Sequence, residues 1–121
     1  MYGRIDPKSI STIDLSFFHG AYLSQVCLGA HDLGLNFDKP AIRIMAQSSF
    51  RMLVGDNISI HQNEEGYRLR PFLNKDVVLA KWAEMGTLIL TFEGGDEIHL
   101  LDDSDQYESY NIGHAGLAII M

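Results

Sequence analysis

Hydrophobic and polar residues alternate along several short stretches of the chain. Leu33, Leu35 and Phe37 lie at alternate positions, and residues 88–92 repeat that pattern. A period of two is typical of a β-strand with one buried face. The Glu-Gly-Gly-Asp sequence at 93–96 predicts a hairpin turn, because glycine adopts positive φ angles without strain. The pattern predicts a mainly β, antiparallel fold of about eight to ten strands, either a barrel or two packed sheets.

The two halves of the chain share this pattern. Residues 17–37 align with residues 72–92 without a gap, so that Leu23 matches Val78 and Cys27 matches Trp82. A turn and a further alternating stretch follow in each half, at 42–44 and 98–100. We predict a single domain over residues 1–121 with an internal repeat, roughly 17–53 and 72–110. Chance similarity between β sequences is the alternative to a duplication.

Three segments carry weaker patterns. Residues 74–84 fit a helix or a strand, and their match to the β-favouring residues 21–28 favours a strand. The linker at 54–71 predicts a short hairpin, with a strand through Ile58 and Ile60 and a returning strand at 67–70. Near the start, Asp6 as a cap and Pro7 at the first position predict a short N-terminal helix that ends near residue 17.

The acidic residues are concentrated in the last third of the chain. Residues 1–81 contain all nine basic residues and eight acidic ones, whereas residues 82–121 contain eight acidic residues and no lysine or arginine. The formal net charge of −7 therefore arises in the second segment. A surface of one sign attracts oppositely charged surfaces, although it also serves solubility. Nucleic acid is a poor partner for such a chain, because its phosphates require Lys and Arg.

We expect a cytoplasmic protein without a membrane partner. Residues 1–7 lack the apolar stretch of a signal peptide, and no run approaches the roughly 20 apolar residues of a membrane span. The single cysteine, Cys27, excludes an intrachain disulfide. Its match with Trp82 predicts a core position and argues against a thiol nucleophile.

The sequence has none of the common catalytic motifs. G-x-S-x-G, H-E-x-x-H, P-loop and G-x-G-x-x-G patterns are absent, and the five histidines lack metal-ligand spacing, so no metal or cofactor is predicted. His99 alternates with Ile98 and Leu100, which places it on the same side of a strand as Glu97. His31, Glu97 and His99 are the candidate residues for small-ligand binding or weak hydrolysis.

An acidic stretch with tyrosines is the candidate protein-binding surface. Residues 102–108 lack the mid-loop glycine of an EF-hand, so calcium binding is not predicted. Tyrosine is enriched at binding hot spots, but tyrosines in strands are also commonly half-buried against their neighbours. We predict a surface for a basic partner that comprises Glu93, Asp96, Glu97, Asp102, Asp103, Asp105, Tyr107, Glu108 and Tyr110.

Motifs in both halves resemble those of a known family. The second half contains Gly86-x-Leu88-x-Leu90-x-Phe92-Glu93-Gly94-Gly95-x-x-Ile98-x-Leu100 and then Tyr107-Glu108-Ser109-Tyr110. Over residues 15–113 the chain resembles a family of small bacterial proteins known as a domain of unknown function, with L-x-L-x-F-x-D-G-x-x-L and Y-E-A-W motifs. In this chain Ser109 and Tyr110 stand where the family has Ala and Trp. The resemblance implies no catalytic residues.

These observations favour a non-enzymatic, acidic protein-binding module. In size and acidity the chain also resembles immunity proteins, which neutralise a companion bacterial toxin, so a basic toxin is the concrete candidate partner. The alternative is a small-ligand-binding β-barrel or weak hydrolase. The apolar residues 116–121 predict a terminal strand, and we expect it to pair with a second copy in a homodimer, since unpaired strand edges associate.

Overall fold

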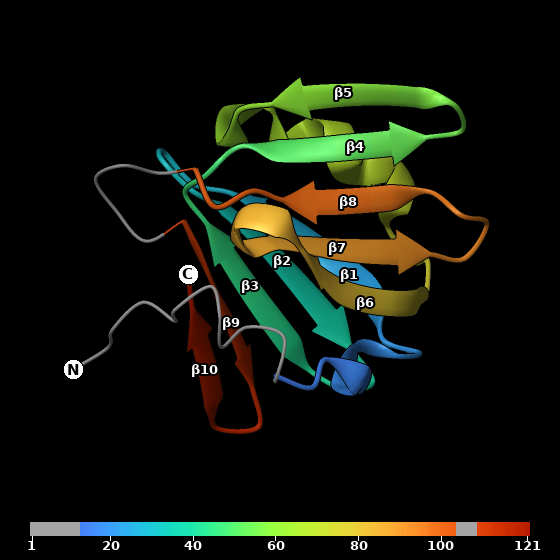
Figure 1. Ribbon diagram of the computed structural model, residues 1–121, viewed down its shortest axis with the longest axis vertical. Helices are drawn as coiled ribbons and strands as arrows, with labels where there is room; N and C mark the ends of the chain where they lie inside the picture. The colour runs from blue at the N-terminus through green and yellow to red at the C-terminus, as the bar shows by residue number, and fades with distance from the viewer. Residues whose placement is uncertain (1–12, 104–108) are drawn as a thin grey trace.

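The computed structural model describes residues 13–103 and 109–121, which form ten strands in two five-stranded antiparallel sheets (Figure 1). Sheet A has the order β1 (Tyr22–Leu28), β2 (Leu33–Asp38), β3 (Ile42–Ala46), β9 (Tyr110–His114) and β10 (Leu117–Ile120). Sheet B has the order β5 (Asn57–His61), β4 (Phe50–Val54), β8 (Glu97–Leu100), β7 (Thr87–Phe92) and β6 (Val77–Ala83). Three 3₁₀ helices accompany them in these residues: η1 (Ser16–Phe18), η2 (Asn63–Phe72) and η3 (Glu84–Gly86).

The mainly β prediction is confirmed, and the fold is two packed sheets instead of a closed barrel. The sheets meet at one corner, where β1 and β6 begin. There the backbone of Tyr22 pairs with that of Asp76, and the amide of Val77 donates to the carbonyl of Ala21 at 2.7 Å. The outer faces of both sheets are therefore separate surfaces, which face in different directions.

The alternating stretches are strands whose apolar side chains face the space between the sheets. Leu33 and Leu35 of β2 and Leu88 and Leu90 of β7 are fully buried. Removing each such side chain from water contributes roughly 1.5–3 kcal/mol. The buried residues of both sheets form one continuous cluster, so the space between the sheets is filled by side chains.

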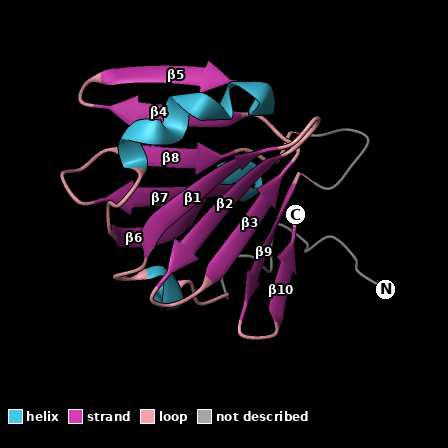
Figure 2. Ribbon diagram, turned by 180° about the vertical axis from the view of Figure 1, so that it is seen from behind, coloured by secondary structure: helices cyan, strands magenta, loops and turns pink. Residues whose placement is uncertain are grey.

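Each sheet combines strands from both halves of the chain. Sheet A contains β1, β2 and β3 followed by the late hairpin β9–β10, and sheet B contains β6, β7 and β8 followed by the early hairpin β4–β5 (Figure 2). Strands β1, β2 and β3 of sheet A correspond to β6, β7 and β8 of sheet B. The hairpin that follows each set of three strands in the sequence joins the other sheet. The duplication itself stays a prediction, but the correspondence allows the aligned positions to be compared.

That comparison moves the β1–β6 alignment by one residue and corrects the position of Cys27. Phe37 pairs with Leu23, and the corresponding Phe92 pairs with Val77, so Leu23 corresponds to Val77 and not to Val78. Cys27 then corresponds to Lys81, which is exposed on the outer face of sheet B, so Cys27 lies on the outer face of sheet A. It is half-buried there, and the side-chain amide of Asn36 lies 3.8 Å from its Sγ. The prediction of a core cysteine was wrong.

The segments with weaker patterns have mixed outcomes. Residues 77–83 form strand β6, as the repeat predicted, and residues 57–61 form strand β5. The returning strand expected at 67–70 is wrong, because these residues lie in η2. Leu69 and Phe72 are both buried, and a spacing of three puts them on one side of a 3₁₀ helix. Asp6 and Pro7 of the expected N-terminal helix lie outside the described residues.

In residues 13–103 and 109–121, no helix has the length and apolar character needed to cross a membrane.

Candidate functional site

The outer face of sheet B carries a polar centre formed by three neighbouring strands. Arg51 of β4 pairs with His99 of β8, which in turn pairs with Ile89 of β7. The neighbours of His99 along β8, Ile98 and Leu100, point into the core. Because side chains alternate along a strand, Arg51, His99 and Ile89 stand side by side on the opposite, outer face.

A chain of hydrogen bonds fixes this centre. The Nε of Arg51 donates to Nδ1 of His99 at 2.8 Å, and Nε2 of His99 lies 2.8 Å from Oε1 of Glu97. A guanidinium group can only donate, so Nδ1 is the acceptor, and Nε2 carries the ring proton and donates it to Glu97. Thr91 donates its hydroxyl to the other carboxylate oxygen of Glu97 at 3.1 Å. Both imidazole nitrogens are thus engaged by neighbouring side chains.

The three candidate ligand-binding residues do not form one site. Glu97 and His99 are hydrogen-bonded to each other, but His31 lies exposed between β1 and β2, where its carbonyl accepts a hydrogen bond from Asn63. In residues 13–103 and 109–121, neither Glu97 nor His99 lines the surface hollows that lie near Arg43, Tyr67 and Pro71. Among the described residues no group of three or more His, Cys, Asp or Glu is placed to hold a metal ion.

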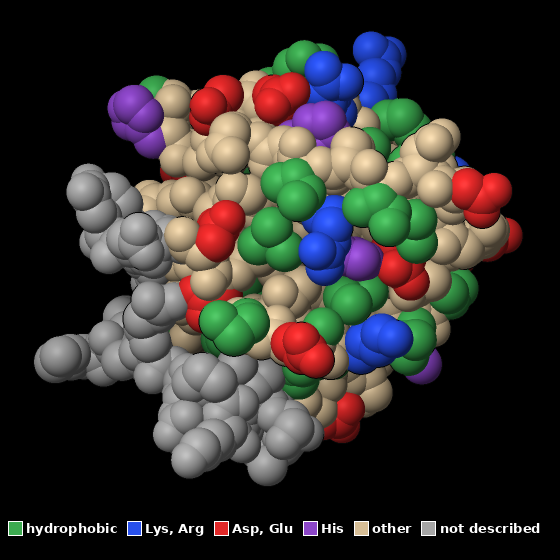
Figure 3. All heavy atoms as spheres, turned by 45° about the horizontal axis from the view of Figure 1, so that its top comes forward, with side chains coloured by type: hydrophobic (Ala, Val, Ile, Leu, Met, Phe, Trp, Pro, Cys, Tyr) green, Lys and Arg blue, Asp and Glu red, His purple; other side chains and the backbone are tan. Residues whose placement is uncertain are grey.

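Exposed apolar side chains flank the polar centre. Ile60 and Ile58 of the edge strand β5 pair with Arg51 and Leu53 of β4, and they are 60% and 68% exposed. On the same face, at the opposite edge of the sheet, Leu79 of β6 is 42% exposed. Figure 3 shows hydrophobic side chains around a cluster of Lys or Arg, His and acidic side chains on this face. We name the face formed by Arg51, Leu53, Ile58, Ile60, Leu79, Ile89, Glu97 and His99 the sheet B face.

The predicted acidic surface is divided between the two ends of β8. Glu93, which is exposed, and Asp96 lie in the turn before β8, whereas Asp102 and Asp103 follow its other end. Asp96 accepts a hydrogen bond from the backbone amide of Gly55 at 3.1 Å and lies 3.8 Å from Nζ of Lys75.

Asp102 and Asp103 also have structural roles. The hydroxyl of the fully buried Ser109 donates a hydrogen bond to Asp102, and the backbone amide of Ser49 donates one to Asp103 at 3.1 Å. These carboxylates therefore hold the connections around β4, β8 and β9 in place. The remaining predicted members, Asp105, Tyr107 and Glu108, lie outside the described residues.

Tyr110 belongs to the core and not to an exposed surface. Its side chain is fully buried, and its hydroxyl donates a hydrogen bond to the carbonyl of Gly86. Burial, with a smaller contribution from the negative charge of Asp102, raises the pKa of Tyr110 far above its ordinary value. The prediction that Tyr110 contacts a partner was wrong, because the hydroxyl and the ring are both enclosed.

Sequence reasoning missed Arg51, Ile58 and Ile60 as members of a surface. The alternation of residues 57–61 predicts a strand, but it does not tell whether the apolar side of that strand is covered. Here β5 is an edge strand, and its isoleucines face outward together with Arg51. The useful signal was the isolated polar residue in the strand Phe50-Arg51-Met52, which marks the outer face of β4.

Comparisons with known proteins return no relatives: no family model, no curated protein and no solved structure matches the chain.

Proposed function

We propose that this chain is a non-enzymatic protein-binding module that docks through the sheet B face. The observation that carries the proposal is the exposure of Ile58 and Ile60 beside the ordered side chain of Arg51. Exposed apolar residues next to a polar rim are typical of interaction surfaces, and arginine is enriched among binding hot spots. The hydrogen bond to His99 holds Arg51 in one position, which lowers the entropy lost on binding.

The support for a basic partner comes from the acidic last third of the chain, since the outer face of sheet B carries Arg51 and the exposed Lys81 as well as Glu97. The exposed Glu93 lies near one end of β8, and Asp103 follows the other end. A partner with an apolar centre and surrounding lysines or arginines would complement this arrangement, and the attraction would speed and orient docking. The concrete form of the proposal is an immunity protein that covers the basic surface of a bacterial toxin. We also propose that the chain is related to the small bacterial family of unknown function that its motifs resemble.

The proposed location is the cytoplasm, where the partly exposed thiol of Cys27 would stay reduced.

A homodimer is proposed through the edge of β10. In the described residues β10 pairs only with β9, while Ile119 and Met121 are already buried in the core. Backbone pairing along this edge, and not a need to cover apolar side chains, would therefore join two copies. Sedimentation velocity at micromolar concentration should give the mass of a dimer, and a monomer at every concentration would contradict this contact.

Photo-crosslinking from positions 58 and 60 tests the docking proposal. A photoreactive residue at either position should capture the same basic protein, because both side chains stand on one face. The exposed Arg43 on sheet A is the control position, and it should not capture that basic protein. Capture from position 43 alone, or of an acidic protein, would count against the proposal.

A further inference from the structure

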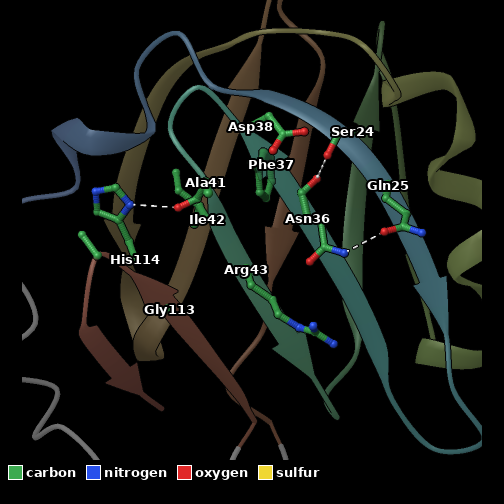
Figure 4. A pocket seen from close by; sticks show the side chains of 11 residues that line it. Ser24, Gln25, Asn36, Phe37, Asp38, Ala41, Ile42, Arg43, Gly113 and His114 are labelled. Carbon is green, nitrogen blue, oxygen red and sulfur yellow. Dashed lines mark hydrogen bonds between the residues drawn. The ribbon is translucent and has the colours of Figure 1, made fainter.

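A polar hollow lies on the outer face of sheet A, away from the sheet B face. It has a volume of about 490 Å³ and is open to solvent, with walls from β1, β2, β3 and β9 (Figure 4). This volume is within the range of roughly 300–1,000 Å³ common for small-molecule sites. The hollow contains a cationic and an anionic side chain, Arg43 and Asp38.

The space beside Arg43 exists because its neighbour has no side chain. Arg43 pairs with Asn36 on one side and with Gly113 on the other. A Cβ at Gly113 would meet only the carbonyl oxygen of Arg43, at 3.9 Å, so the fold does not require glycine there for lack of room. Between the described residues, the guanidinium of Arg43 makes no ion pair and is available to a ligand.

Asp38 provides the opposite charge on the same face. It lies two residues beyond Asn36 on β2, and Asn36 is opposite Arg43. The diagonal relation between Asp38 and Arg43 puts their Cβ atoms roughly 7–8 Å apart or less. The Arg43 side chain extends away from Asp38, so the two charges lie at opposite ends of the hollow (Figure 4). Asp38 is exposed, and it makes no ion pair with any residue in the described part of the chain. The two opposite charges thus face the hollow without neutralising each other.

Hydrogen bonds keep the floor and one wall of the hollow in place. The Asn36 side chain donates to Oε1 of Gln25 at 2.9 Å, and Ser24 donates its hydroxyl to the Asn36 carbonyl at 3.0 Å. At the far side, Nδ1 of His114 lies 3.0 Å from the carbonyl oxygen of Ala41 (Figure 4). The His114 ring also stacks on Phe17, with 4.6 Å between the ring centroids. A site whose walls are already ordered loses less entropy when a ligand binds.

We propose that this hollow binds a short zwitterionic peptide, with its carboxylate at Arg43 and its ammonium group at Asp38, because the two charged ends of a peptide lie farther apart than those of a free amino acid. Arginine pairs with carboxylates through two parallel N–H donors, and an aspartate accepts from an ammonium group. A simple anion would be repelled by Asp38, and a simple cation by Arg43. The proposal concerns a different sheet from the docking surface, so either can fail without the other.

Titration with glycylglycine, followed by ¹H–¹⁵N NMR, tests this site. Saturable shifts are expected at the amides of Asn36, Arg43 and Gly113, with a dissociation constant in the millimolar range for two solvent-exposed charged contacts. Acetate and ethylammonium each satisfy one charge and should bind about tenfold or more weakly. R43Q and D38N should each weaken glycylglycine binding about tenfold. Absence of saturable shifts, equal binding of acetate, or unchanged affinity of both variants would overturn the proposal.

Gly113→Val tests the hollow without removing a charge. The valine side chain should fill the space beside Arg43 and abolish glycylglycine binding, while the melting temperature changes little. Ala118→Val is the matched control, because Ala118 is exposed on the adjacent strand and does not line the hollow. Binding by G113V equal to that of the wild type would overturn the site. Should G113V fail to fold, the R43Q and D38N titrations still decide the proposal.

Discussion

Replacing Tyr110 with alanine is expected to lower the free energy of unfolding by about 3–5 kcal/mol, as for other large buried aromatic residues. Tyr110 is fully buried, and its hydroxyl donates to the carbonyl of Gly86, in the η3 turn before β7. The substitution removes the ring and leaves that carbonyl without this donor. Urea unfolding followed by circular dichroism measures the change.

Two further variants separate the contributions at this position. Tyr110→Phe keeps the ring and removes the hydroxyl, so a smaller loss of about 1–2 kcal/mol is expected. Met85→Ala is the control, because Met85 is 82% exposed, and its unfolding free energy should stay within about 0.5 kcal/mol of the wild type. If Y110A were as stable as M85A, Tyr110 would not be a core residue.

The same tyrosine contributes to the pH dependence of stability. Its pKa in the folded protein is raised above the unfolded value of about 10, so the folded state holds the phenol proton more tightly. This contribution is fully present below pH 10 and is lost as the pH rises further, because the unfolded chain then releases the proton more readily. In Y110F this part of the decline above pH 10 should disappear.

The double variant Ile58→Ser/Ile60→Ser is expected to weaken binding of the partner captured from the sheet B face by about 100-fold or more. Truncation of hot-spot residues typically costs at least about 2 kcal/mol each, and 1.4 kcal/mol corresponds to a factor of ten. Serine removes apolar area without changing the charge that would attract a basic partner. Isothermal titration calorimetry of wild type and variant measures the difference.

Leu28→Ser is the matched control for this change. Leu28 is 53% exposed but lies on β1 of sheet A, so its loss should leave the affinity unchanged. The double variant should also keep nearly the wild-type stability, since Ile58 and Ile60 are largely exposed. Equal affinities of I58S/I60S and wild type would exclude the isoleucines from the interface.

The sequence was sufficient to predict much of the fold. Alternation at Leu33-x-Leu35-x-Phe37 and at residues 88–92 predicted strands whose apolar residues are indeed buried. The β1–β6 comparison failed by one residue, because four residues, 29–32, separate the paired Leu28 and Leu33, whereas five, 83–87, separate the corresponding Trp82 and Leu88. An alignment without a gap does not show this difference. Both strands also contain a bulge at the same corresponding position, after Leu23 and after Val77, and alternation alone does not locate it.

The candidate site was less predictable, since it depends on which strands are neighbours. Arg51 and His99 are 48 positions apart, and they meet because the hairpin β4–β5 joins β8 instead of its own half. The local sequence predicted the pair Glu97 and His99, two residues apart on one strand. It also grouped the acidic residues 93–103, which β8 separates at its two ends. Acidic residues that are close in sequence therefore lie farther apart in space than the sequence suggested, because an extended strand separates them.

The most direct test of the account is the map of photo-crosslinks formed in cells by the full chain. Positions 58 and 60 sample the sheet B face, and position 43 samples the outer face of sheet A. The account predicts one basic partner, captured from both 58 and 60 and not from 43, with a yield that falls as ionic strength rises in the purified complex. Capture of that partner from position 43, with none from 58 or 60, would contradict the assignment of the docking surface to sheet B.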